Sequence, residues 1–252
     1  MLKTSFRPIR KPRLAFYAFL TSAALAVPQA LHPANIAIPF SPSNFSNPLN
    51  ISNVLFPLVA GKTLIYHAAT PDGCEEDRMA ITSQTKTIAG VTARVVHDAV
   101  YVGPTCAGRL KLEEDTFDWY AQDDSRNVWY LGEDSKDCST GRCIQNPGSW
   151  QAGVNGAQPG TVMLANPHQG DHYRQEYYAG HAEDEAAVDG VGLNVMLTRP
   201  DAYQPRLFRN CIKTREFTRL EPGAVGYKYY CPNFGIVMED EKGFHSELVA
   251  IR

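Results

Sequence analysis

Six cysteines constrain this sequence most, because cysteines that are neighbours along the chain bracket turn-forming residues. Cys74 and Cys106 are centred on Gly90, Cys138 and Cys143 flank Ser-Thr-Gly-Arg, and Cys211 and Cys231 are centred beside Pro222-Gly223. Residues equidistant from a hairpin turn face each other across an antiparallel pair, at a Cα distance that a disulfide can span. The spacing therefore predicts three disulfides, each local to one hairpin.

A cysteine-bound metal is the competing interpretation of these residues. The sequence contains no C-x-x-C pair, and the successive cysteine spacings of 32, 32, 5, 68 and 20 residues match no common zinc pattern. Paired cysteines also leave no thiol to act as a nucleophile. We expect disulfides, which form in oxidising compartments outside the cytoplasm.

The first residues have the pattern of an export signal. Five basic residues precede an apolar stretch from Leu14 to Val27, and Ala24-Leu25-Ala26 offers a small-x-small cleavage site. A retained membrane anchor is the alternative, but the stretch is short for a membrane span and contains Thr21 and Ser22. We predict a signal peptide over residues 1–26 and a secreted or periplasmic protein.

Cleavage would change the charge of the protein. The whole chain has 24 basic and 27 acidic residues, a net charge of −3, whereas residues 27–252 keep 19 basic and 27 acidic residues, a net charge of about −8. Nucleic acid and anionic membrane surfaces are poor partners for such a chain. We expect no nucleic acid partner and a soluble rather than membrane-spanning protein.

Proline and asparagine dominate residues 27–57, which include Pro28, Pro33, Pro39, Pro42, Pro48 and Pro57. Such a stretch cannot sustain a helix or a central strand. It is typical of a linker, and we expect a single β-rich domain over residues 58–252.

From Leu58 onward, runs rich in Val, Ile, Thr, Tyr and Phe alternate with turn residues. The predicted strands are 63–67, 78–88, 91–102, 109–122, 128–132, 172–178, 207–219, 225–230, 235–239 and 246–251. Residues 182–188 could form one or two helical turns. The predicted fold class is all-β, an antiparallel meander that forms a strongly curved sheet, open barrel or sandwich with hairpin disulfides.

The densest polar segment lies between residues 166 and 184. Its candidate metal-ligating or catalytic residues are His168, Asp171, His172, Glu176, His181, Glu183 and Asp184. Imidazole together with carboxylate suits zinc, copper or iron, so a divalent metal is one interpretation, and otherwise no cofactor is expected. The other interpretation is a solvated strand face, because Gln169-Gly170-Asp171 is typical of a turn that opens a strand.

Aromatic residues flank a predicted turn at residues 123–127. Trp119 and Tyr120 precede this turn and Trp129 and Tyr130 follow it, so the two tryptophans are placed to pair across strands. An exposed pair of this kind would stack against sugars, whereas a buried pair would be ordinary core. Both interpretations stay open.

Three motifs resemble a broad group of exported, β-rich bacterial proteins. The segment Pro57-Leu58-Val59-Ala60-Gly61 is similar to their Pro-Leu-x-x-Gly opening strand, and Gly235-Ile236-Val237 resembles their Gly-x-Val closing strand. Residues 119–130 match their aromatic hairpin, except that Arg126 stands where a turn glycine is expected. The resemblance implies a curved antiparallel sheet in the cell envelope or outside the cell, and it transfers no catalytic residue.

These patterns favour an exported, non-catalytic β-protein with a ligand-binding or envelope role. Its partner would be a small hydrophobic ligand, a glycan, or an envelope component. The alternatives are a secreted hydrolase or metal-dependent enzyme that uses residues 168–184, and a glycan-binding module that uses Trp119 and Trp129. No G-x-S-x-G, P-loop or H-E-x-x-H motif is present, but two carboxylates can support hydrolysis without a local motif.

Overall fold

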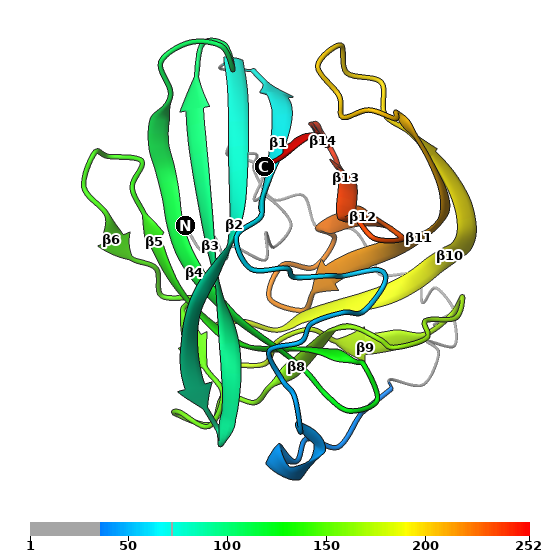
Figure 1. Ribbon diagram of the computed structural model, residues 1–252. Helices are drawn as coiled ribbons and strands as arrows, with labels where there is room; N and C mark the ends of the chain where they lie inside the picture. The colour runs from blue at the N-terminus through cyan, green and yellow to red at the C-terminus, as the bar shows by residue number, and fades with distance from the viewer. Residues whose placement is uncertain (1–35, 72) are drawn as a thin grey trace, which may run out of the picture.

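The computed structural model describes residues 36–71 and 73–252, and Figure 1 shows them as one sheet that curls round on itself. A short 3₁₀ helix, η1 (Pro42–Asn44), precedes the strands. The strands are β1 (Thr63–Thr70), β2 (Gly73–Ile88), β3 (Val91–Gly103), β4 (Lys111–Gln122), β5 (Val128–Asp137), β6 (Ile144–Gln145), β7 (Trp150–Gln151), β8 (Gly160–Met163), β9 (His172–Arg174), β10 (Asp184–Met196), β11 (Leu207–Thr218), β12 (Val225–Cys231), β13 (Gly235–Glu241) and β14 (Phe244–Ile251). The predicted all-β meander is confirmed. The predicted signal peptide, and residues 27–35 of the predicted linker, lie outside the described residues.

Every strand pairing in the described part of the chain is antiparallel. The order across the sheet is β6-β5-β4-β3-β2-β1-β14-β13-β12-β11-β10-β9, and β7 and β8 both pair with β5. The last strand thus lies beside the first, which gives the meander its strong curvature (Figure 1). The sheet is not closed: among the described residues, its end strands β6 and β9 do not pair, and an isolated bridge joins Gln158 to Tyr177.

The three predicted disulfides are present. Cys211 and Cys231 adjoin the paired residues Ile212 and Tyr230, so their Cα atoms face each other 4.2 Å apart across β11 and β12. The Cys138–Cys143 bond closes the turn between β5 and β6 in the same way. The Cys74–Cys106 bond differs, because Cys74 pairs with Gly103 and Cys106 lies in the loop after β3.

Two glycines allow the backbone to approach itself closely where the sheet divides around β5. A Cβ atom on Gly160 of β8 would lie 1.9 Å from the backbone oxygen of Gln175. A Cβ atom on Gly132 of β5 would lie 2.3 Å from the backbone oxygen of Trp150. Only glycine fits these two positions.

The described part of the predicted linker packs against the sheet. Phe45, Ile51 and Phe56 are buried in the main core, and the Phe56 ring contacts the ring of Tyr120, with centroids 5.5 Å apart. The Asn53 amide donates to two backbone oxygens of the loops beside β5 and β8. Prolines do exclude a helix and a central strand here, but the apolar residues between them contribute to the core, as a spacer would not.

Strand β10 corrects the helical turns predicted at residues 182–188. Ala186 pairs with Tyr173 of β9 on one side and with Glu216 of β11 on the other. Residues 184–188 are buried on both faces, and this packing outweighs the helix preference of alanine and glutamate. The strand predicted over 172–178 is also shorter, since β9 ends at Arg174.

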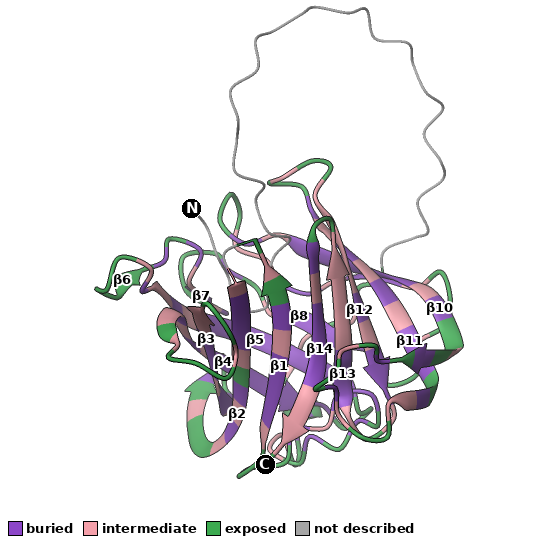
Figure 2. Cartoon of the chain, turned by 90° about the horizontal axis from the view of Figure 1, so that it is seen from above, coloured by how far each residue is buried: buried purple, intermediate pink, exposed green. Residues whose placement is uncertain are grey.

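Burial follows the strands, and Figure 2 shows buried residues along them and exposed residues at the turns. The largest fully buried side chains include Tyr120, Tyr130, Tyr173 and Tyr230. The first two come from β4 and β5, on one side of the central β1–β14 pair, and the last two from β9 and β12, on the other side. No helix in the described ranges is long and apolar enough to cross a membrane.

Candidate functional site

The candidate residues between 168 and 184 lie at separate places around β9. The His168 Nδ1 and Asp171 Oδ2 atoms are 3.7 Å apart in an exposed pair. His172 instead meets Glu185 of β10, with Nε2 and Oε2 2.6 Å apart in the interior. This segment is therefore not the solvated strand face that the sequence left open, since β9 is covered on its His172 side.

Of the remaining candidates, His181 lies apart, whereas Glu176 and Asp184 are neighbours. The His181 ring stacks on the Tyr178 ring, with centroids 4.3 Å apart. Glu176 and Asp184 are buried. Among the described residues, no three His, Cys, Asp or Glu side chains are placed to hold a metal ion. The structure therefore does not bring these seven candidate residues together as one set of metal ligands.

Glu176 and Asp184 belong to a different group, the inner acidic cluster, which we define as Asp118, Glu133, Glu176, Asp184 and Glu216 together with Lys228. All six residues are buried. They come from β4, β5, the segment after β9, β10, β11 and β12, so the curvature of the sheet brings them together from distant parts of the sequence.

Burial has a strong effect on these carboxyl groups. Burial raises the pKa of Glu176 well above its ordinary value, and the charges of Asp184 and Glu133 raise it further. Burial also raises the pKa of Asp184 to about 7, although a hydrogen bond with Thr218 opposes this. A buried carboxyl group without a close cation favours its neutral form.

Lys228 is the cation of the cluster. Its Nζ atom lies 2.9 Å from Glu216 Oε2. Burial by itself would lower the pKa of the ammonium group, but Glu216 and Glu239 raise it above its ordinary value. Glu216 also accepts hydrogen bonds from Gln175 and from Tyr230, which fixes the carboxylate in place.

A tyrosine joins the other two carboxyl groups of the cluster. The Tyr130 hydroxyl lies 2.7 Å from Asp118 Oδ1 and 2.8 Å from Glu133 Oε2. Burial raises the pKa of Tyr130 well above its ordinary value, so the hydroxyl keeps its proton. The hydroxyl has one proton to donate, so it donates to one of these carboxyl groups and its oxygen accepts from the other when that group is protonated.

The predicted tryptophan pair does not form. A bulge between Asp118 and Tyr120 shifts the register, so Trp129 lies opposite Ala121. Tyr120 and Tyr130 form the cross-strand pair instead, stacked with centroids 4.9 Å apart.

Trp129 is enclosed by the core. Its ring packs against those of Phe40 and Phe45, and its Nε1 atom donates to Asp123 Oδ2. Of the four residues that were candidates for stacking against a ligand, Trp119 lines a pocket beside β5.

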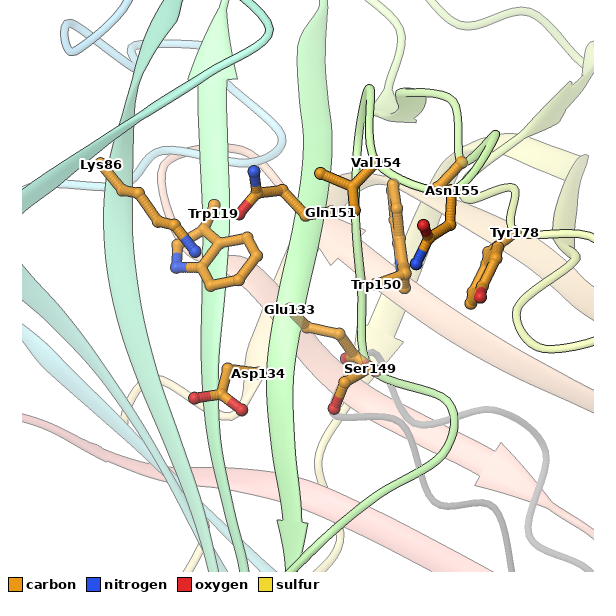
Figure 3. A pocket seen from close by; sticks show the side chains of 11 residues that line it. Lys86, Trp119, Glu133, Asp134, Ser149, Trp150, Gln151, Val154, Asn155 and Tyr178 are labelled. Carbon is orange, nitrogen blue, oxygen red and sulfur yellow. The ribbon is translucent and has the colours of Figure 1, made fainter.

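That pocket, of about 290 Å³, lies where β5 passes between β4 and β7 (Figure 3). Strand β2 contributes Lys86, and Figure 3 shows Lys86 and Trp119 at one end and Tyr178 at the other. The lining residues are Lys86, Trp119, Glu133, Asp134, Ser149, Trp150, Gln151, Val154, Asn155, Ala157 and Tyr178. We call it the β5 pocket.

Lysine and tryptophan stack at one end of the β5 pocket. The Lys86 Nζ atom lies 3.3 Å from the centre of the Trp119 ring, a cation–π contact. Partial burial lowers the pKa of the Lys86 ammonium group, and the charge of Asp134 opposes this. The Lys86 ammonium group therefore covers one face of the Trp119 ring.

The β5 pocket and the inner acidic cluster share a wall. Glu133 lines the pocket and belongs to the cluster. Trp150 also lines the pocket, and its Nε1 atom donates to Glu176 Oε2 over 2.9 Å. An edge-to-face contact with Tyr130, with centroids 5.4 Å apart, holds the Trp150 ring from behind.

Sequence reasoning missed Lys86, Gln151 and Asn155. A usable signal was present, because Asn155-Gly156 is a strong hairpin turn motif, and both residues have positive φ, 52° and 82°. This turn joins β7 to β8 and places Gln151 and Asn155 at the pocket.

Comparisons with known proteins give little further information. No family model matches the sequence. No curated protein matches it either. Among solved structures, the fold has a weak likeness to one described as a "putative lipoprotein" from Parabacteroides distasonis ATCC 8503, with 9% identity, a TM-score of 0.38, and coverage of 79% of this chain and 99% of that one.

Proposed function

We propose that this chain is an exported, non-catalytic protein that binds a small polar ligand in the β5 pocket. The observation that carries the proposal is the composition of this pocket. Indole rings from β4 and β7 meet the side-chain amides of Gln151 and Asn155 in a space of about 290 Å³. Pockets that combine aromatic rings with a few convergent polar groups are the usual form of small-molecule sites.

The rigidity of the pocket supports a binding role. Trp150 is held by Glu176 and by the Tyr130 ring, and Gly132 allows β7 to lie close against β5. The Trp150 wall is fixed before binding, so this wall loses little conformational entropy when the ligand arrives.

Two observations favour binding over catalysis. The histidines of the predicted enzyme site face separate neighbours, and Glu176 is covered by Trp150 rather than presented to the pocket. A catalytic acid must lie within hydrogen-bond reach of the substrate.

Ligand binding is tested by saturation-transfer NMR on the oxidised protein with a library of monosaccharides, amino acids, polyamines, nucleosides and dicarboxylates. We expect at least one compound to bind, and binding to be lost in the double variant Gln151→Ala, Asn155→Gly. Gln84→Ala, Asn233→Gly is the matched control, since both residues are exposed and Asn233, like Asn155, has positive φ. Absence of binding, or equal binding by both double variants, would contradict the proposal.

Export is supported by the three disulfides and by the basic and apolar leader. Expression of the full chain, followed by cell fractionation and mass spectrometry, tests it. We expect a periplasmic or secreted product that begins at Val27 and contains no free thiol. A cytoplasmic product that retains Met1 to Ala26 would contradict export.

A further inference from the structure

Two polar side chains of the β5 pocket are available to a ligand. The amides of Gln151 and Asn155 make no hydrogen bond to any described residue. Each amide offers both a donor and an acceptor. This mixture matches hydroxyl groups, which also donate and accept, better than it matches a purely anionic or cationic group.

The β5 pocket is lined by charged groups of both signs: one cation, Lys86, and two carboxyl groups, Glu133 and Asp134. Lys86 is engaged with the Trp119 ring and lies near Asp134, and Asp134 is also 3.9 Å from the Lys136 ammonium. A strongly charged ligand would meet charges of both signs here. Electrostatic complementarity therefore favours an uncharged ligand.

Shape adds an aromatic surface. Tyr178 lies at the end of the pocket opposite Trp119 (Figure 3) and is held by stacking on His181. The half-buried phenol ring can pack against the apolar C–H face of a sugar ring while the amides bind its hydroxyls. The volume of about 290 Å³ is at the lower limit for ligand sites, which suits one ring rather than a long chain.

We propose that the ligand of the β5 pocket is a neutral saccharide ring, bound through Gln151 and Asn155 and packed against Tyr178. This inference rests on the proposed ligand-binding function and names its ligand class. Trp129, the partner of Trp119 in the sequence-based glycan hypothesis, has no part in it.

Titration of intrinsic tryptophan fluorescence tests the inference, since sugars do not absorb at the excitation wavelength. The probes are D-glucose, D-galactose and N-acetyl-D-glucosamine as neutral rings, with D-glucosamine and D-glucuronate as charged ones. We expect at least one neutral ring to bind. Gln151→Ala and Asn155→Gly should each weaken its affinity about 3- to 10-fold, the value of one hydrogen bond. Gln84→Ala and Asn233→Gly should leave it unchanged.

A second pair of variants tests the aromatic contact. Tyr178→Phe should retain the affinity and Tyr178→Leu should reduce it, while thermal unfolding shows whether each variant is folded. If the charged rings bind and the neutral ones do not, or if the library yields only a ligand of another class, the saccharide inference is overturned and the binding function stands. If no compound binds in either experiment, both fail.

Discussion

Several carboxyl groups of this protein are buried, and burial raises the pKa of two of them, Glu176 and Asp184. Glu176 and Asp184 lie in the sequence segment that predicted a metal or catalytic site, yet they face an interior that raises the pKa of each. The residue types could be read from the sequence. Their burial could not, because it depends on β5, β11 and β12, which are more than 20 residues away in the sequence.

Asp184 makes the stability of the fold dependent on pH. Its pKa is about 7 in the folded protein and about 4 in an unfolded chain, so the folded protein holds a proton that the unfolded chain releases. Its contribution to stability is complete below about pH 4 and is lost as the pH rises through 7. Asp184→Asn should therefore reduce the fall in the free energy of unfolding between pH 4.5 and pH 8.

Urea denaturation across that pH range measures the effect. Asp189→Asn, at a half-buried carboxylate paired with Arg215, is the control and should follow the wild-type profile more closely. Identical pH profiles for the wild-type protein and Asp184→Asn would contradict this account of Asp184.

Gly160 is required where the two ends of the sheet meet. A Cβ atom there would lie 1.9 Å from a backbone oxygen, so Gly160→Ala must displace β8 or the segment after β9. We expect a loss of about 3 kcal/mol in the free energy of unfolding, the upper range for overpacking. Gly108→Ala, where the nearest atom is a side-chain oxygen of Thr105, should change it by about 0.5 kcal/mol or less. Equal effects in chemical denaturation would exclude this role for Gly160.

Local sequence predicts the elements of this fold unevenly. Turn residues located the hairpins, and cysteine spacing located all three disulfides. Both signals are local, because the turn residues of a hairpin and the cysteines that flank them lie in one continuous segment of the chain. Strand β10 was missed because its alanines and glutamates favour a helix, and only pairing with β9 and β11 makes it a strand. Two-residue strands such as β7 were missed because they are too short to show alternation.

Loop length ranks the disulfides. The entropy model gives about 4 kcal/mol for the Cys74–Cys106 bond, about 3 kcal/mol for Cys211–Cys231 and about 2 kcal/mol for Cys138–Cys143, whose sequence separations are 32, 20 and 5 residues. We expect paired Cys→Ser variants to lose stability in this order when unfolded in urea. A Cys138/Cys143 variant that is the least stable of the three would refute the ranking.

The β5 pocket is a property of the whole molecule. Its walls come from β2, β4, β5, β7 and the segment after β9, which approach one another because the sheet curls and β5 takes partners on both sides. Sequence alone identified Trp119 as a candidate but assigned it the wrong aromatic neighbour, since the bulge after Asp118 changes which residues face each other. A single bulge of this kind has no clear signature in one sequence.

Residues 36–57 pack against the sheet and contribute to the main core. Prolines suggested a linker, but Phe45, Ile51 and Phe56 complete the core beneath the aromatic hairpin. Arg126, which stands where the resemblance predicts a turn glycine, adopts the positive φ of 73° that glycine favours and donates to the backbone of Ser52 in the same segment. The turn and the N-terminal segment thus stabilise each other.

Indole resonances of the three tryptophans test the central claim, that the β5 pocket is the ligand site. Each indole N–H gives one peak in a ¹⁵N-correlated NMR spectrum, assigned through Trp→Phe variants. On titration with N-acetyl-D-glucosamine or D-glucose, we predict that the Trp119 peak moves, because the Trp119 ring lines the pocket. The Trp129 peak should stay in place, because its N–H is bonded to Asp123 within the core. Movement of Trp129 without Trp119, or no movement of any indole peak, would contradict the claim.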